Sequence, residues 1–243
     1  MHRWIGVIRS LAIYNNPLSA WSWRRFYHGL LSKDDLVFDI GAHVGSRARA
    51  MRAAGARVVA LEPQQPFASY LRLTLPRDIT LIEAAAGPDE AETEMAVSSR
   101  HPTVSSLQSD FVTGAATAPG FEHVEWDQKQ RVRMVTLDGL IARFGMPRYV
   151  KIDVEGYEIE VLAGLSSAVP ILSVEYLPGF PDLTRAVITR LGDLGDYRFN
   201  VVQGERGGFL WSEWRDAHDL CAWLDDLPSD AGSGDLFARL HAP

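Results

Sequence analysis

Cysteine is nearly absent from this chain. Its 243 residues include one cysteine, Cys221, so no intramolecular disulfide can form and no CxxC pair can hold zinc. Packing must therefore stabilise the fold, and the composition suits a reducing, cytoplasmic location.

Basic residues are fewer than acidic ones. The chain has 24 Lys and Arg residues against 31 Asp and Glu residues, for a net charge of -7. Proteins that bind nucleic acid usually concentrate Lys and Arg on one face. We therefore expect no nucleic-acid partner, and nothing in the sequence indicates the oligomeric state.

Long apolar runs are missing as well. No stretch approaches the roughly 20 uncharged apolar residues of a membrane helix, so no transmembrane segment is predicted. Near the N-terminus, Trp4, Ile5, Ile8 and Leu11 recur at helical spacing. Arg9 interrupts this stretch and no small-residue cleavage site follows, so we expect mature protein rather than a signal peptide. Such a helix could lie on a membrane surface, but we expect it to pack on the main domain.

What is present suits one globular domain. The length and a hydrophobic content of 47% predict a single domain over residues 1–243. After a helical lead-in over residues 1–30, short apolar runs alternate with helical patterns, which is typical of a mostly parallel α/β sheet with helices on both faces. The predicted strands are 36–40, 57–61, 79–82, 131–135, 149–154 and 171–176, and the predicted helices are 48–54, 66–75, 137–144 and 183–191. Residues 197–202 and 209–211, joined across glycines, predict an antiparallel hairpin at the C-terminal end.

One long segment has no such periodicity. Residues 98–130 are rich in Ser, Thr, Gly and Pro, and a loop of this length in a compact domain usually has a function. We interpret it as a candidate lid or acceptor-recognition insertion. Its aromatic and imidazole side chains, Phe111, Phe121, His123 and Trp126, are candidates for shaping a pocket.

Four predicted strands end in a carboxylate: Asp39, Glu62, Asp153 and Glu175. Strands of a parallel sheet are covered on both faces, so a charge inside one demands a reason. Ligands of open α/β sheets bind outside the carboxyl ends of the strands, and we expect these side chains to surround one ligand site. Structural roles remain open for single residues, such as an ion pair between Asp39 and Lys151.

The turn after the first strand narrows the choice of ligand. Its sequence, DIGAHVG over residues 39–45, supplies glycines for a tight turn and for close backbone approach. Glu62, at the end of the next strand, suits the two hydroxyls of an adenosine ribose, a device that NAD enzymes share. GxxxG lacks the glycine spacing of the pyrophosphate-binding GxGxxG turn. The predicted cofactor is therefore S-adenosylmethionine, whose cationic sulfur and amino group suit Asp39 and Asp153.

Several segments together resemble the FkbM methyltransferase family. They are VFDIGAHVG, GARVVALEPQ, VRMVTLDGL and above all VKIDVEGYEIEVLAGL, and the resemblance covers residues 35–177. It implies a Rossmann-like class I methyltransferase sheet that ends in an antiparallel pair. It also implies a cofactor site made by Asp39, Gly41, Ala42, His43, Gly45, Glu62, Glu83, Ala84 and Asp153, with Glu83 and Ala84 against the adenine. Residues 105–107 resemble a family segment that folds toward the site, with an ordinary turn as the alternative.

The resemblance implies methyl transfer, and we expect the acceptor to be a hydroxyl of a sugar, a glycan or a secondary metabolite. Asp153 is the first candidate for the base that removes the hydroxyl proton, with Glu155 and His43 as second choices. His43 stands where the family usually has Asn, so it could instead only shape the turn. We expect no metal, although Asp153 and Glu175 could together hold magnesium. The alternatives are a non-catalytic cofactor-binding scaffold and, less favoured, an NAD-dependent oxidoreductase.

Overall fold

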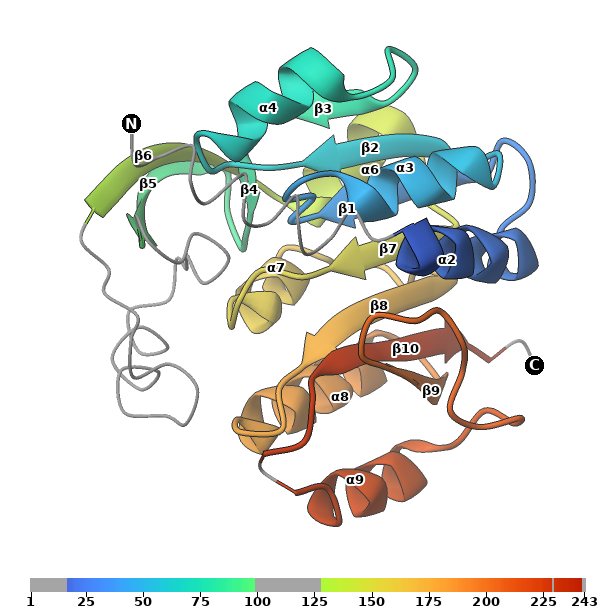
Figure 1. Ribbon diagram of the computed structural model, residues 1–243. Helices are drawn as coiled ribbons and strands as arrows, with labels where there is room; N and C mark the ends of the chain where they lie inside the picture. The colour runs from blue at the N-terminus through green and yellow to red at the C-terminus, as the bar shows by residue number, and fades with distance from the viewer. Residues whose placement is uncertain (1–16, 99–127, 229, 242–243) are drawn as a thin grey trace.

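The computed structural model describes residues 17–98, 128–228 and 230–241 (Figure 1). The apolar N-terminal segment that includes Trp4 and Ile8 lies outside these residues. The predicted lid or recognition insertion also falls almost entirely outside them, together with residues 105–107 and the four aromatic or imidazole side chains named above. Among the described helices, none is long and apolar enough to cross a bilayer.

A seven-stranded sheet forms the centre of the molecule, in the order β3-β2-β1-β7-β8-β10-β9. β10 pairs antiparallel with both of its neighbours, and the other pairings in this sheet are parallel. The strand order reverses between β1 and β7, which is where α/β sheets of this kind bind ligands. The predicted fold class is confirmed. The strands are β1 (Leu36–Ile40), β2 (Arg57–Leu61), β3 (Thr80–Ile82), β7 (Tyr149–Ile152), β8 (Ile171–Tyr176), β9 (Tyr197–Gln203) and β10 (Gly234–Leu240).

Helices cover both faces of this sheet because successive strand residues point to opposite sides. In β1, Val37 packs with the core under α2 (Pro17–Leu30) and α3 (Ser46–Ala53), whereas Phe38 packs with the core on the other face. That second core is covered by α6 (Leu137–Phe144), α7 (Glu158–Ala163), α8 (Pro181–Leu194) and α9 (Ala217–Asp225). α4 (Phe67–Thr74) lies beside β3 at the edge of the sheet (Figure 1).

The strand predicted at 131–135 exists, but it lies outside the central sheet. It is part of β6 (Gln128–Val135), which pairs with β4 (Ala85–Ala86) and β5 (Ala91–Val97) in a separate three-stranded sheet. Exposed side chains such as Arg131 and Arg133 alternate with the buried Val132 and Met134. This alternation is typical of a strand that is covered on one face only.

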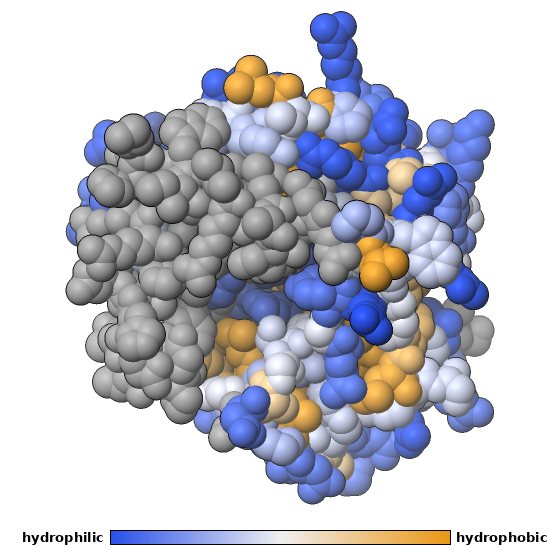
Figure 2. Space-filling model, viewed as in Figure 1, coloured by the Kyte–Doolittle hydropathy of each residue, from blue (hydrophilic) through white to orange (hydrophobic). Residues whose placement is uncertain are grey.

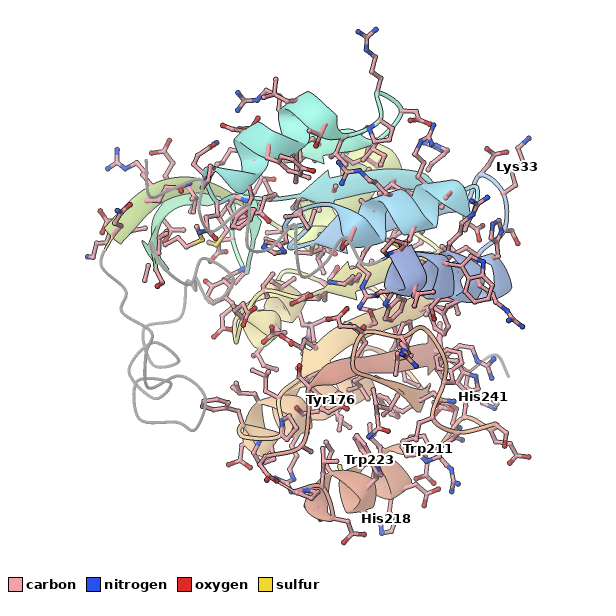
Figure 3. The ribbon with its side chains drawn as sticks, viewed as in Figure 1. Lys33, Tyr176, Trp211, His218, Trp223 and His241 are labelled. Carbon is pink, nitrogen blue, oxygen red and sulfur yellow. The ribbon has the colours of Figure 1, made fainter. Side chains whose placement is uncertain are left out.

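The predicted hairpin between 197–202 and 209–211 is wrong. β9 pairs with β10 along its whole length, whereas the 209–211 segment gives β9 one backbone hydrogen bond, from Leu210 N–H to the Val201 carbonyl at 2.7 Å. The reason is burial, because Phe237 of β10 is fully buried while Leu210 is exposed. Tyr176, Trp211 and Trp223 stack edge to face where this segment and α9 pack on the sheet (Figure 3).

Candidate active site

A cavity opens at the carboxyl ends of β1, β2, β7 and β8. Its empty volume is about 1150 Å³, counted out to its open mouth. On the molecular face in Figure 2, hydrophilic residues predominate and apolar ones are scattered among them. The predicted site residues that line the cavity are Gly41, Ala42, His43, Glu62, Ala84, Asp153 and Glu155.

The carboxylate of Glu62 holds the turn after β1. Its Oε2 accepts a hydrogen bond from the His43 backbone N–H at 2.7 Å, and its Oε1 accepts one from Gln64 N–H at 2.8 Å. Burial raises the pKa of Glu62 to about 7, although these two N–H groups oppose the shift. Each carboxylate oxygen can accept a further hydrogen bond. Glu62 therefore both fixes the turn and retains acceptor capacity for a ligand.

The turn after β1 requires glycine because the end of β7 packs closely against it. Gly41 has φ +81°, and a Cβ there would stand 1.9 Å from the carbonyl oxygen of Asp153. Gly45 also has positive φ, and a Cβ there would meet Arg49 and Leu71. The close approach at Gly41 is thus to the protein's own backbone, and it brings the end of β7 against the turn after β1.

His43 adopts the left-handed conformation that its position in the turn requires, with φ +50°. Its ring centroid lies 4.3 Å from that of Phe67. Burial lowers the pKa of the His43 imidazole to about 4, so the ring is neutral at pH 7. These observations favour a shaping role, because such a low pKa makes the imidazole a weak proton acceptor.

A buried lysine faces Asp153. The Nζ of Lys151 lies 2.7 Å from Oδ2 of Asp153, and their side chains are 3% and 36% exposed. Burial raises the pKa of Asp153, but the ammonium of Lys151 and its hydrogen bond outweigh burial and hold that pKa below its ordinary value. Asp153 is therefore ionised at neutral pH and accessible from the cavity.

Asp39 lies behind this pair and does not line the cavity. It stands opposite Lys151 in the register of β1 and β7. Among the described residues, neither of its carboxylate oxygens has a hydrogen-bond partner. Burial raises the pKa of Asp39, against the attraction of Lys151. The lysine ion-pairs with Asp153 rather than Asp39, so the alternative of an Asp39–Lys151 ion pair is not the arrangement found.

Three carboxylates, which we call the carboxylate trio, converge at the cavity. Asp153, Glu155 and Glu175 each offer an oxygen within 4.8 Å of the others. Burial, followed by the charge of Asp153, raises the pKa of both glutamates well above the ordinary value. The Oε2 of Glu175 is buried and without a hydrogen-bond partner in the described part of the chain. A cationic ligand would favour the ionised forms of these carboxylates, which is the chemistry of a sulfonium and an amino group.

The turn that carries Glu155 is held by a residue that the sequence analysis did not single out. The Oε1 of Glu158 accepts hydrogen bonds from the backbone N–H groups of Val154 and Gly156, at 3.3 and 3.2 Å. Glu155 itself has φ +53°, a conformation uncommon outside glycine. Glu158 therefore maintains an otherwise unfavourable turn at the mouth of the cavity.

Glu83 is not brought together with the other candidates. Its carboxylate pairs with Arg72, at 2.7 and 2.6 Å, and accepts a hydrogen bond from Gln65. It borders a second cavity beside β6. Ala84, the next residue, is fully buried and lines the main cavity together with Leu61 and Ala85. The adenine contact expected of Glu83 therefore remains a prediction.

Two charged residues of the cavity were missed by the sequence analysis. Arg47, the second residue of α3, and Glu205, which follows β9, both line it and form an ion pair at 3.2 Å. The predicted helix began at Ala48, so Arg47 was not considered. A basic residue two positions after the last glycine of the turn was the available signal, because a helix N-terminus at a strand end borders the ligand crevice.

Comparisons with known proteins address the family of the chain. A family model described as the methyltransferase FkbM domain matches residues 39–232. No curated protein matches the chain. A TehB-like SAM-dependent methyltransferase structure from Corynebacterium glutamicum is similar at a TM-score of 0.48 and 9% identity, over 98% of this chain and 96% of that chain.

Two further solved structures are similar at comparable distance. An O-methyltransferase from Bacillus cereus in complex with SAH gives a TM-score of 0.46 and 10% identity, over 97% of this chain and 89% of that chain. A precorrin-6y C5,15-methyltransferase from Geobacter metallireducens gives a TM-score of 0.44 and 16% identity, over 90% of this chain and 87% of that chain. These likenesses are too distant to carry an argument about this chain.

The family match begins at Asp39, at the end of β1, and extends over α9. It therefore includes the glycine turn, Glu62 and the carboxylate trio. With these residues around one cavity and the strand order described above, the chain belongs to the FkbM family of class I methyltransferases, whose methyl donor is S-adenosylmethionine.

Proposed function

We propose that this protein transfers a methyl group to a hydroxyl of a small molecule, such as a sugar, a glycan unit or a secondary metabolite. The observation that carries this proposal is Asp153, an ionised carboxylate that is open to the cavity and fixed by Lys151. A neutral hydroxyl is a poor nucleophile and benefits from a positioned base that takes its proton. An acceptor that is already anionic would be repelled by the ionised Asp153.

The residues around the cavity fit S-adenosylmethionine. Glu62 has the acceptor capacity for the ribose hydroxyls, and small apolar residues including Ala84 line the cavity for the adenine. Gly41, Ala42 and His43 form one wall, which we assign with Gly45 to the methionine part. The carboxylate trio lines the cavity where it would hold the positive charges of the cofactor, and Asp39 lies behind Lys151. When bound, the cofactor supplies an electrophilic methyl group on a positively charged sulfur.

Asp153 is proposed to accept the hydroxyl proton as the new oxygen–carbon bond forms. Lys151 orients this carboxylate through the 2.7 Å contact and keeps it ionised between turnovers. Glu155 is the less suitable base, because burial and the charge of Asp153 raise its pKa well above the ordinary value and so favour its protonated form. His43 is neutral but too weakly basic to compete. Alignment of the acceptor in the cavity supplies a further part of the acceleration.

The test is transfer of labelled methyl from S-adenosylmethionine to a panel of sugars and of alcohols that resemble secondary metabolites. Mass spectrometry and the carbon-13 shift of the new methyl group distinguish an O-methyl product from N- and C-methyl products. An O-methyl product that depends on Asp153 supports the proposal. Methylation at nitrogen or carbon would contradict it, and tight cofactor binding without transfer to any acceptor class would favour the scaffold alternative.

A further inference from the structure

Arg47 is held rigidly at the edge of the cavity. Its guanidinium carbon lies 3.2 Å from the centroid of the Trp23 ring, and its side chain is 14% exposed. Its NH2 nitrogen is 3.6 Å from Oδ2 of Asp235, a largely buried residue of β10. Stacking on an aromatic ring and a fixed carboxylate partner restrict the rotamers of an arginine. Its remaining hydrogen-bond donors are therefore preorganised.

Arg47 has a second carboxylate partner, Glu205, which is more exposed than Asp235. Glu205 contacts the same nitrogen at 3.2 Å, but its side chain is 59% exposed. Its backbone is fixed, because its carbonyl accepts hydrogen bonds from Trp23 Nε1–H at 3.0 Å and from the Ser19 hydroxyl at 2.8 Å. An ion pair in which one partner is largely exposed contributes little stability. The Glu205 carboxylate can therefore swing away from Arg47 while its backbone stays in place.

The charges of the cavity leave one suitable place for an anionic group. Among its described lining residues, the positively charged ones are Arg47 and Lys151, since His43 is neutral, and Lys151 is already hydrogen-bonded to Asp153. Arg47 lies in the first turn of α3, whose N-cap Gly45 supplies no side-chain acceptor to the helix N–H groups. Both the guanidinium and the helix N-terminus favour a carboxylate there.

We infer that Arg47 binds the carboxylate of the methionine part of the cofactor, and that the Glu205 carboxylate occupies this position until the cofactor displaces it. The inference rests on S-adenosylmethionine being the ligand of this cavity. It makes Arg47 the group that distinguishes the whole cofactor from adenosyl compounds without a carboxylate. Glu205 then acts as an internal competitor that weakens cofactor binding without touching the adenosine end.

The test compares two ligands by calorimetric titration: S-adenosylhomocysteine and its decarboxylated analogue, which retains the amine. Arg47→Gln should weaken S-adenosylhomocysteine by about 10- to 100-fold, the usual effect of a lost charge-assisted hydrogen bond. Affinity for the decarboxylated analogue should change less than twofold. Glu205→Gln should strengthen S-adenosylhomocysteine by about two- to fivefold and leave the analogue unchanged. Glu213→Gln, on the same segment and exposed, is the matched control.

Arg47→Lys serves if Arg47→Gln does not fold, since it keeps the charge but loses the planar donor pair. It should weaken S-adenosylhomocysteine selectively and by a smaller factor. Equal weakening of both ligands, or of neither, would overturn the inference. If the wild-type protein binds neither ligand, the cofactor assignment itself fails, which is a different result from loss of discrimination in the variants.

Discussion

Replacing Asp153 by asparagine removes one negative charge from the cavity and keeps the size of the side chain nearly unchanged. The amide keeps an oxygen that can accept the hydrogen bond from Lys151, so the shape of the site should persist. Breaking a buried ion pair usually costs about 3–5 kcal/mol, but Asp153 is 36% exposed and keeps an acceptor. We therefore expect a loss of about 1–3 kcal/mol in the free energy of unfolding.

The effect on turnover should be much larger. General-base catalysis contributes about 10²- to 10⁴-fold, so kcat should fall by a factor in this range while S-adenosylhomocysteine still binds measurably. Single-turnover methyl transfer with enzyme in excess separates chemistry from product release, and titration calorimetry measures binding. Asp193→Asn, an exposed change of the same kind on α8, is the control. If folded Asp153→Asn enzyme transfers methyl within about threefold of the wild-type rate, far from the loss that general-base catalysis predicts, Asp153 is not the base.

Three further predictions concern the turn, the ribose contact and metal. Gly41→Ala should destabilise the fold by about 2–5 kcal/mol, because the backbone there is left-handed and the new Cβ would clash with the Asp153 carbonyl. The control is Gly192→Ala in α8, which has open space at its Cβ and should stabilise the fold by up to about 1 kcal/mol. Urea unfolding measures both variants, and equal effects would refute the packing argument. The pKa of Glu62 is raised to about 7, and the ionised form would accept hydrogen bonds from the ribose hydroxyls, so cofactor affinity should fall about tenfold from pH 8 to pH 6. Titration calorimetry at several pH values measures this dependence, and Glu62→Gln should flatten it. A dependence as steep as that of the wild type would count against the ribose role. Dialysis against EDTA should leave methyl transfer unchanged, because Asp153 is already ion-paired with Lys151. Activity that is lost on dialysis and restored by Mg²⁺ would show that the carboxylate trio holds a metal.

The sequence predicted the parallel half of the sheet closely. β1, β2 and β8 have the predicted bounds, because each is an apolar run between clear turn signals. β10 could not be found in this way, since Asp235 and Arg239 interrupt its apolar residues and the segment reads as a polar tail. Its burial depends on pairing with β8 on one side and β9 on the other. Such long-range pairing leaves no local periodicity to detect.

The candidate site was predictable as a set of strand ends but not as a set of contacts. Asp153 and Glu62 were found because a charge at the end of an apolar strand is unusual. The sequence left the partner of Lys151 open between two residues. Asp153 shares a strand face with Lys151 because strand side chains alternate with a period of two, whereas Asp39 lies next to Lys151 on the neighbouring strand. Arg47 and Glu205 lie in a helix and a loop, where charged residues are ordinary, so only the folded arrangement distinguishes them.

Helix α2, at the N-terminal side of the described fold, supports two residues that line the ligand cavity, Arg47 and Glu205. Trp23 lies against the Arg47 guanidinium, and Ser19 with Trp23 anchors the backbone of Glu205. A shortened protein that starts at the first strand would keep every sequence segment that identifies the family, yet it would lose this supporting wall. Recognition of the family by sequence and retention of a working cofactor site are therefore separable properties of this chain.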